Sequence, residues 1–269
     1  GHSTQPHHLY AAARQSPHGM TSLAARIRDP RPGRVCQRGL WLTFLGPFGV
    51  EAVAGATSAA GLDWLGVDLQ HGAFEPADVA AVLRASRLPV LVRVASHHPA
   101  ALARVLDAGA DGVIVPAVES AAQARALVDA AYPPPRGHRS TGVCRAALVG
   151  AASLADGPLI LPMIETRAGL DDAAEILDVD GVDGVFVGPY DLALSLGAPS
   201  VTAEPVLEAI DAVLAGARER GRATGLFAGN AQLTRRYADV DLLGVDSDVN
   251  ALRVGLAALF GTPEPDASA

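Results

Sequence analysis

Short apolar runs alternate along the chain with longer stretches in which apolar residues recur at helical spacing. The runs are almost continuously hydrophobic, which is typical of strands buried on both faces of a parallel sheet. Most of them start about 20–30 residues apart, the length of one strand and the helix that follows it. The runs predict eight strands, at residues 39–45, 64–70, 89–95, 112–118, 159–165, 184–189, 223–229 and 242–248.

Two of the intervening stretches illustrate the helical pattern. Residues 76–86 place Val79, Val82 and Leu83 on one face of a helix. Residues 99–109 begin with proline, which suits a first helical turn, and end with glycine, a common C-terminal cap. We therefore expect strands and helices to alternate regularly.

This alternation predicts one α/β domain, a TIM (β/α)8 barrel at residues 38–262, followed by a C-terminal tail at residues 263–269. A doubly wound open sheet is the alternative. It favours a glycine-rich G-x-G-x-x-G loop after its first strand, and FLGPFGVEA at residues 44–52 does not fit that pattern. Residues 132–158 form a connection so long that we expect it to be functional.

The N-terminal residues differ from the rest in charge. Residues 1–38 carry six arginines and one acidic residue, whereas residues 39–269 carry 15 arginines and 28 acidic residues. The opening segment has no helical or strand period, so we treat residues 1–37 as a basic tail that is disordered or foreign to the natural chain. Such a tail could contact nucleic acid, but the acidic body argues against nucleic acid as a partner.

Composition excludes several classes of protein. The chain contains no lysine, whereas Schiff-base enzymes, PLP enzymes among them, and P-loop nucleotide-binding proteins need one. No apolar run approaches the roughly 18 residues that cross a bilayer. The two cysteines, Cys36 and Cys144, provide no disulfide framework. We therefore expect a cytoplasmic protein without membrane contact, Schiff-base lysine, PLP or nucleotide.

Two carboxylates follow neighbouring strands where a TIM barrel carries its chemistry, at the strands' C-terminal ends. Glu165 ends the run LILPMIE, and Asp191 follows the next strand in GVFVGPYDLA. Neighbouring parallel strands lie about 4.8 Å apart, so both carboxylates can reach one ion. Two carboxylates and water suit a hard divalent cation, Mg²⁺ or Mn²⁺. The alternative for Asp191 is to cap the helix that follows it.

A histidine and an arginine could join this site. His71 follows the second strand in VDLQHG, and imidazole is the natural proton carrier near neutral pH, although a turn histidine bonded to backbone is the alternative. Arg93 lies inside the run VLVRV, where a guanidinium is costly unless it is paired. It should face the metal ligands or a substrate acid, or form a structural ion pair with Asp68 or Glu165. For the remaining histidines of the body we expect no role in the chemistry: His97, His98 and His138.

Several of these segments together resemble the HpcH/HpaI aldolase family, the metal-dependent 2-keto acid aldolases of the phosphoenolpyruvate/pyruvate superfamily. The resemblance covers roughly residues 38–260 and is most specific in PMIETRAG and GVDGVFVGPYDL. It implies a TIM barrel and a divalent-metal-dependent aldolase, a carbon–carbon lyase that makes or cleaves 4-hydroxy-2-keto acids through a pyruvate enolate. It also implies a 2-keto acid and an aldehyde as small-molecule partners, and commonly a homo-oligomer, a hexamer built from dimers.

The resemblance assigns roles to individual residues. Glu165 and Asp191 resemble the family's metal ligands, and His71 resembles its acid/base, which acts through water. Arg93 resembles the arginine that steadies the enolate. Two further acids resemble supporting residues, namely Asp68 beside the histidine and Asp107, which orients the histidine and often does so across a subunit boundary.

Other residues resemble the family's substrate pocket. Trp41 resembles a tryptophan of the pocket wall, and the backbone at Gly188, Pro189, Tyr190 and Asp191 resembles the cradle for the pyruvate carboxylate. Two positions depart from common choices, because Gln70 stands where some members have Glu, and Met163 stands where many aldolases have Gln. Met163 removes a polar group from the pocket and leaves the substrate open.

Three alternative functions accompany this prediction. On the same scaffold, the chain could decarboxylate oxaloacetate or form carbon–carbon bonds from an enolate. A non-catalytic ligand-binding barrel would keep the fold without the metal. A role in nucleic-acid binding through residues 1–37 is the third.

Overall fold

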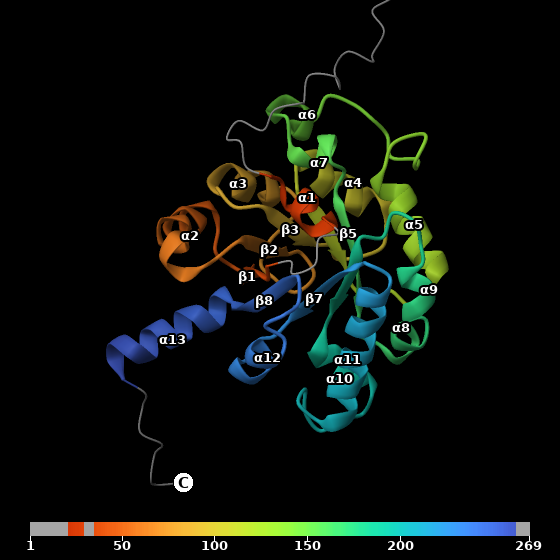
Figure 1. The fold of residues 1–269 in the computed structure, drawn as a ribbon. Coiled ribbons are helices and arrows are strands. Elements are labelled where there is room, and N and C mark those ends of the chain that lie inside the picture. The colour runs from red at the N-terminus through yellow and green to blue at the C-terminus, as the bar shows by residue number, and fades with distance from the viewer. Residues whose placement is uncertain (1–20, 30–34, 262–269) are drawn as a thin grey trace, which may run out of the picture.

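The strands close into a parallel barrel in which each strand pairs with the next along the chain and β8 pairs with β1 (Figure 1). The computed structural model describes residues 21–29 and 35–261. The predicted TIM barrel is confirmed, and all eight strands lie within the predicted ranges or within two residues of them. They are β1 Gln37–Leu42, β2 Trp64–Asp68, β3 Val90–Arg93, β4 Gly112–Val115, β5 Leu159–Ile164, β6 Gly184–Val187, β7 Ala223–Phe227 and β8 Leu242–Ser247.

Helices surround the barrel and connect successive strands. Pro99 stands in the first turn of α4, and Gly109 caps its end at φ 104°, a left-handed conformation that glycine adopts without strain. The helices are α1 Leu23–Arg28, α2 Pro47–Ala60, α3 Asp78–Ala85, α4 Pro99–Ala108, α5 Ala121–Ala131, α6 Arg145–Val149, α7 Ala152–Ala155, α8 Arg167–Asp171, α9 Ala173–Leu177, α10 Pro189–Ser195, α11 Glu204–Glu219, α12 Ala231–Arg236 and α13 Asp248–Phe260. None of these helices is both long and apolar enough to cross a membrane.

Side chains alternate along the strands between the barrel interior and the helical layer. In β5, Leu159, Leu161 and Met163 belong to the interior cluster, whereas Ile160 and Ile164 belong to the layer between strands and helices. The next inward position after Met163 is the first residue beyond the strand, Glu165. The pleat of β5 therefore delivers this carboxylate to the C-terminal rim.

The barrel interior is filled by large rings that pack over glycines. A Cβ atom on Gly39 would lie 2.2 Å from the ring of Trp64, and one on Gly66 would lie 2.7 Å from the ring of Trp41. Trp41 also stacks on Phe186, with ring centroids 5.8 Å apart. The interior is thus a packed core, and the space for a ligand lies at the rim.

A short helix at the N-terminal end of the barrel differs from the sequence prediction. Residues 23–28, assigned to the tail 1–37, form α1, and Leu23 and Ile27 are buried in the interior cluster. Arg28 pairs with Asp183 at 2.6 Å. A helix of six residues is too short to show an apolar period in the sequence. Of the predicted tails, residues 1–20, 30–34 and 263–269 lie outside the described residues.

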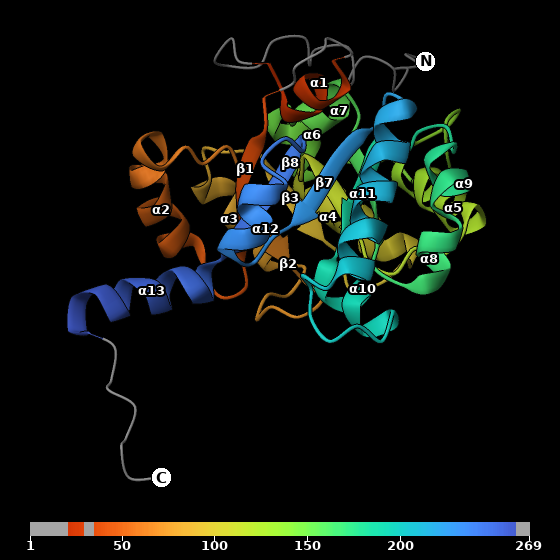
Figure 2. The same cartoon turned by 60° about the horizontal axis from the view of Figure 1, so that its bottom comes forward.

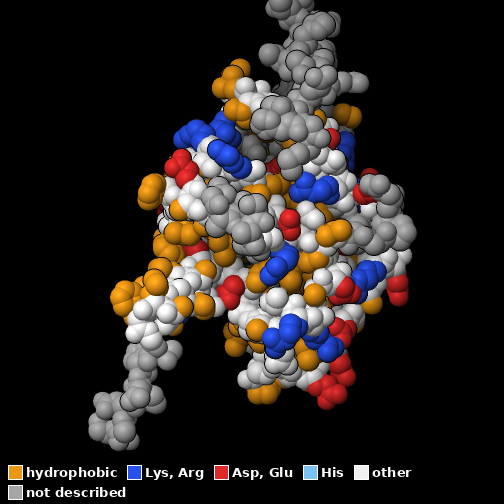
Figure 3. Space-filling view, turned by 60° about the vertical axis from the view of Figure 1, so that its left-hand side comes forward, with side chains coloured by type: hydrophobic (Ala, Val, Ile, Leu, Met, Phe, Trp, Pro, Cys, Tyr) orange, Lys and Arg blue, Asp and Glu red, His pale blue; other side chains and the backbone are white. Residues whose placement is uncertain are grey.

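Helix α13 leaves the barrel and projects away from it (Figures 1 and 2). Its first residue, Asp248, is 1% exposed and accepts hydrogen bonds from the backbone of Thr43, Phe44 and Leu45, so the start of the helix is firmly anchored. Hydrophobic side chains gather on the projecting helix (Figure 3). Its exposed large residues are Leu252, Val254, Leu256, Leu259 and Phe260.

Candidate active site

A cavity of about 250 Å³ opens at the C-terminal rim of the barrel. Every strand except β4 contributes a lining residue from its end or from the loop that follows it. Ten of the twelve predicted site residues line the cavity: Trp41, Asp68, His71, Arg93, Met163, Glu165, Gly188, Pro189, Tyr190 and Asp191. Three residues that were not among the predicted site residues complete it: Thr43, Phe227 and Ser247. These three also stand at strand ends or just beyond them. The rule that a TIM barrel carries its chemistry at the C-terminal ends of its strands therefore applies to them as well.

Glu165 is a buried carboxylate with one oxygen left over. Its side chain is 5% exposed, and Oε1 accepts a 2.7 Å hydrogen bond from the backbone N–H of Ala117. Oε2 is buried without a hydrogen-bond partner among the described residues. Burial raises the pKa of Glu165 above its usual value, and the negative charge of Asp191 adds to the rise. The unsatisfied oxygen marks a place where a cation would be favourable.

The turn that donates to Glu165 has an unusual backbone. Ala117 has φ 48° and is the one non-glycine residue with positive φ in residues 21–29 and 35–261. The turn is held on both sides, because Nε2 of His97 lies 2.6 Å from the carbonyl oxygen of Pro116, and Val118 donates to the carbonyl oxygen of Met163 at 3.2 Å. No role was expected for His97, and nothing in its neighbourhood in the sequence points to this long-range contact.

Asp191 stands beside Glu165 at the end of the neighbouring strand. Ile164 of β5 pairs with Val187 of β6, and Asp191 lies in the first turn of α10, four residues after β6. The cap position of α10 is Gly188, so the alternative interpretation of Asp191 as a helix cap is wrong. A Cβ atom on Gly188 would lie 2.6 Å from Oε2 of Glu165, so any larger residue at this position would clash with that oxygen.

Arg93 forms a two-pronged ion pair with Asp68 inside the cavity wall. Its Nε and Nη2 donate to the two carboxylate oxygens at 2.9 and 2.5 Å. The guanidinium also lies 5.2 Å from the centre of the Trp41 ring. Burial acts to raise the pKa of Asp68, but the hydrogen bonds and charge of Arg93 outweigh it and hold the pKa below its usual value. Of the partners considered for Arg93, the structure therefore selects Asp68.

Asp68 also shapes the turn that carries His71. Its Oδ1 accepts hydrogen bonds from the backbone N–H groups of Gln70 at 2.9 Å and His71 at 3.2 Å. A Cβ atom on Gly72 would lie 2.4 Å from the carbonyl oxygen of Asp68, so the turn closes tightly at a glycine. The imidazole of His71 is exposed and lines the cavity, where it can reach a bound ligand.

Two predicted residues are not brought into the cavity. Asp107 lies on α4 with a 45% exposed side chain, 3.5 Å from the guanidinium of Arg139. Gln70 does not line the cavity, and its Oε1 is buried without a partner among the described residues.

Apolar groups form much of the cavity wall. Met163 is 2% exposed, faces inward on the same side of β5 as Glu165 and lines the cavity. The ring of Phe227 lies 5.5 Å from Trp41 and 6.3 Å from Tyr190, measured between centroids. Met163 and these rings give the cavity an apolar wall.

Comparisons with known proteins find relatives along most of the chain. Residues 40–247 match the family model described as HpcH/HpaI aldolase/citrate lyase. A hydroxypyruvate/pyruvate aldolase of Roseovarius nubinhibens is 40% identical over 78% of this chain and 86% of its own length. A 4-hydroxy-2-oxo-heptane-1,7-dioate aldolase of Shigella boydii is 35% identical over 89% of this chain and 95% of its own.

A solved structure extends the similarity to three dimensions. A HpcH/HpaI aldolase/citrate lyase family protein from Burkholderia cenocepacia has a TM-score of 0.77 and 34% identity, covering 88% of this chain and 97% of its own. The resemblance predicted from the sequence is confirmed.

Proposed function

The chain belongs to the HpcH/HpaI aldolase/citrate lyase family, and from that premise we propose that it is a divalent-metal-dependent aldolase of the pyruvate type. It makes or cleaves 4-hydroxy-2-keto acids through a pyruvate enolate, with a 2-keto acid and an aldehyde as its small-molecule partners. The observation that carries this proposal is the buried Oε2 of Glu165, which has no hydrogen-bond partner in the part of the chain that the structure describes and lies at a cavity beside a second carboxylate, Asp191.

Glu165 and Asp191 would hold the ion. Their oxygens suit a hard cation, Mg²⁺ or Mn²⁺, which keeps several water or substrate ligands of its own. The described residues contain no group of three or more His, Cys, Asp or Glu that could hold a metal, so this chain would supply two acidic ligands and leave the other positions to substrate and water. When bound, such an ion acts as a Lewis acid that polarises the keto group.

The other residues would handle protons and charge. Arg93, fixed by Asp68 and stacked near Trp41, presents a positive charge toward the cavity where the enolate develops. His71, presented by the turn on Asp68, would take the proton of the 4-hydroxyl during cleavage and return it during synthesis. Gly188, Pro189 and Tyr190 would cradle the carboxylate of the keto acid. The N–H of Gly188 already donates to the carbonyl oxygen of Ile164, and proline has none. The backbone N–H groups of Tyr190 and Asp191, in the first turn of α10, would therefore be the donors.

We also propose a homo-oligomer, with the hexamer as the expected form, and a cytoplasmic location. Helix α13 supports association, because it carries one charged residue after its first turn, Arg253, and exposes Leu259 by 79% and Phe260 by 82%. Asp107 lies outside this chain's cavity on an exposed part of α4, which fits a role toward a neighbouring copy. Both cysteines are free, as a reducing compartment favours.

A panel of pyruvate with different aldehydes, supplemented with Mn²⁺ and followed by mass detection of adducts, tests the proposed function. We expect 4-hydroxy-2-keto acids to form and the reaction to stop in excess EDTA. Oxaloacetate alone is the comparison arm, since its decarboxylation without any aldol product would favour the decarboxylase instead. Full activity in excess EDTA would contradict the metal-dependent scheme.

The variant His71→Ala separates proton transfer from metal binding. It should retain Mn²⁺ affinity, measured by calorimetry, and lose about 100-fold or more in turnover, the range typical of a general acid/base. Loss of Mn²⁺ binding in this variant would assign His71 to the metal site instead.

A further inference from the structure

A second cavity lies at the N-terminal end of the barrel, away from the rim that carries Glu165. Its volume is about 260 Å³, and it lies between the segment Tyr132–Arg139 and α7, just before β5 begins. Helices α1, α6 and α7 gather at this end of the molecule (Figure 1). The cavity belongs to the long connection 132–158, for which the sequence predicts a function that the rim does not explain.

Two buried donors in the wall of this cavity lack partners. The side chain of Arg139 is 9% exposed, and its Nε has no hydrogen-bond partner among the described residues. Its ion pair with Asp107 is long, at 3.5 Å. Ser153, 6% exposed, has a buried hydroxyl that is likewise without a partner. Buried donors, and a buried guanidinium above all, are costly when they stay unsatisfied, which favours an acceptor in the cavity.

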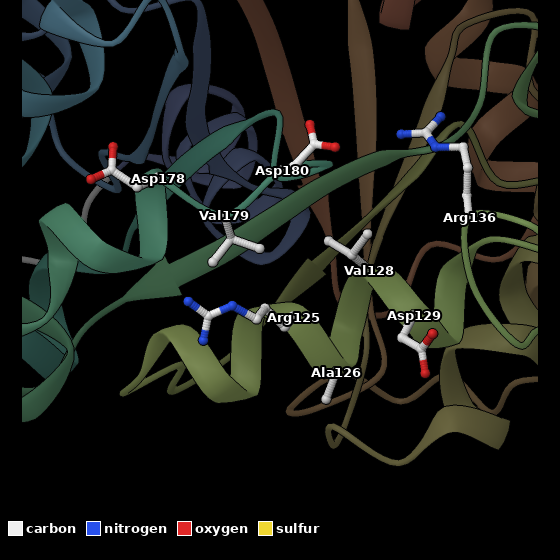
Figure 4. Close-up of a pocket in the computed structure, with 8 residues that line it drawn as sticks. All are labelled: Arg125, Ala126, Val128, Asp129, Arg136, Asp178, Val179 and Asp180. Carbon is white, nitrogen blue, oxygen red and sulfur yellow. The ribbon is translucent and has the colours of Figure 1, made fainter.

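Arg136 brings a second positive charge to the same wall. Its guanidinium lies 3.8 Å from the centre of the Tyr132 ring, which orients it by a cation–π contact. Within the described part of the chain Arg136 forms no ion pair with a carboxylate. It also borders a neighbouring cavity between α5 and the turn after α9, where Asp129 and Asp180 lie (Figure 4).

One carboxylate lines the cavity and is already engaged. Asp156 accepts a hydrogen bond from the hydroxyl of Ser22, which stands immediately before α1. The carbonyl oxygens of Asp156 and Pro158 accept from the guanidinium of Arg28. Arg136 and Arg139, the second of which has a long ion pair with Asp107, therefore bring two positive charges to a wall that holds one carboxylate.

We propose that this cavity is a binding site for a small oxyanion, with Arg136 and Arg139 as charged donors and the hydroxyl of Ser153 as the third donor. Three donors from separate parts of the wall suit a tetrahedral phosphate better than a planar carboxylate. The apolar remainder of the wall, Pro133–Pro135, leaves room for a short organic group on the phosphate. The site is independent of the proposed aldolase chemistry.

Titration of the full chain with inorganic phosphate, in buffer without divalent cations, tests this site by calorimetry. We expect one saturable site. Arg139→Gln should weaken it about tenfold or more, and Ser153→Ala about fivefold, the effects of losing a charged and a neutral hydrogen bond. Arg125→Gln is the matched control, because Arg125 lines the neighbouring cavity and not this one. Acetate should bind more weakly than phosphate, and equal or tighter acetate binding would overturn the choice of a tetrahedral ligand.

Two further measurements keep the test decisive. Arg136 is exposed, so Arg136→Gln should fold normally and still weaken phosphate, even if Arg139→Gln lowers stability. Glu165→Gln should leave phosphate affinity unchanged. Three outcomes would overturn the proposal. They are absence of saturable binding, phosphate affinity in all three cavity variants equal to that of the original chain, and loss of binding in Glu165→Gln, which would place phosphate at the rim.

Discussion

The two ends of the barrel interior carry different side chains at their inward positions, apolar ones at the N-terminal end and carboxylates at the C-terminal rim. At the N-terminal end, α1 inserts Leu23 and Ile27 into the interior cluster, and both side chains are at most 3% exposed. At the C-terminal rim, the inward positions carry Glu165 and Asp68 instead, and one of their oxygens has no partner among the described residues. The barrel interior itself is closed by apolar packing at its N-terminal end, whereas at the rim it opens into the cavity at which this oxygen of Glu165 lies.

The inward residues at the N-terminal end of the barrel should therefore stabilise the fold, whereas those at the C-terminal rim should serve the proposed chemistry. A buried Leu against apolar neighbours stabilises the fold, whereas a buried carboxylate with a free oxygen costs stability until it binds a cation. Substitutions at the two ends should therefore have opposite signatures, and the following variants test that division.

The largest effect is expected at the rim, from Glu165→Gln. The amide keeps an acceptor for the N–H of Ala117 but removes the charge that would hold a cation, so Mn²⁺ affinity and aldol turnover should fall together, turnover by about 1,000-fold or 4 kcal/mol. The melting temperature without metal should stay the same or rise. Glu175→Gln, on the exposed face of α9, is the control. Turnover within tenfold of the original chain would remove Glu165 from the chemistry.

The opposite signature is expected from Leu23→Ala at the closed end. The variant leaves a cavity under α1 and should lower the free energy of unfolding by about 3 kcal/mol, measured by urea denaturation. Mn²⁺ affinity should not change. Leu148→Ala, at a side chain that is 75% exposed on α6, should leave stability nearly unchanged. A stability loss for Leu23→Ala no larger than this control would show that α1 does not close the barrel.

Asp111 tests the closed end through pH. It accepts a hydrogen bond from Val90 at 2.8 Å, and burial raises its pKa to about 6 in spite of that bond and of the charge of Arg26. Because the unfolded pKa is about 4, the unfolded chain loses this proton first as pH rises. The folded state is therefore penalised progressively between about pH 4 and pH 6.

Asp111→Asn removes that penalty. The stability of the variant relative to the original chain should rise by up to about 3 kcal/mol from pH 4 to pH 7. Urea denaturation at each pH measures this difference. A difference that stays constant over this range would show that Asp111 has an ordinary pKa.

The smallest effect concerns Ala117, which holds Glu165 from the neighbouring strand. A β-branched residue tolerates positive φ poorly, so Ala117→Val should lower the free energy of unfolding by about 1 kcal/mol. Mn²⁺ binding should weaken by a few-fold, which corresponds to a loss of about 1 kcal/mol in the binding free energy. Ala117→Gly keeps the conformation and serves as the control for Mn²⁺ affinity. Equal Mn²⁺ affinity in both variants would show that the turn does not position Glu165.

The sequence was sufficient for features that depend on strand order. Near-continuous apolar runs predicted the eight strands, and the meeting of strand ends at one rim predicted that Glu165, Asp191 and Arg93 would share a cavity. Features set by tertiary contacts were missed, because α1 is six residues long and the bond from His97 to Pro116 joins separate loops. The alternative of Asp191 as a helix cap failed because the chain turns into α10 earlier, at Pro189.

The rings that fill the barrel interior also have a kinetic consequence. Trp64, fully buried above Gly39, and Phe186, fully buried beside Trp41, block any path along the barrel axis. Under the proposed function, cation and substrates would therefore enter at the rim, where Glu165 is 5% exposed. A molecule bound above Glu165 would block the exit of any molecule that bound before it. We therefore expect ordered kinetics, in which the proposed cation binds before the substrates and leaves after them.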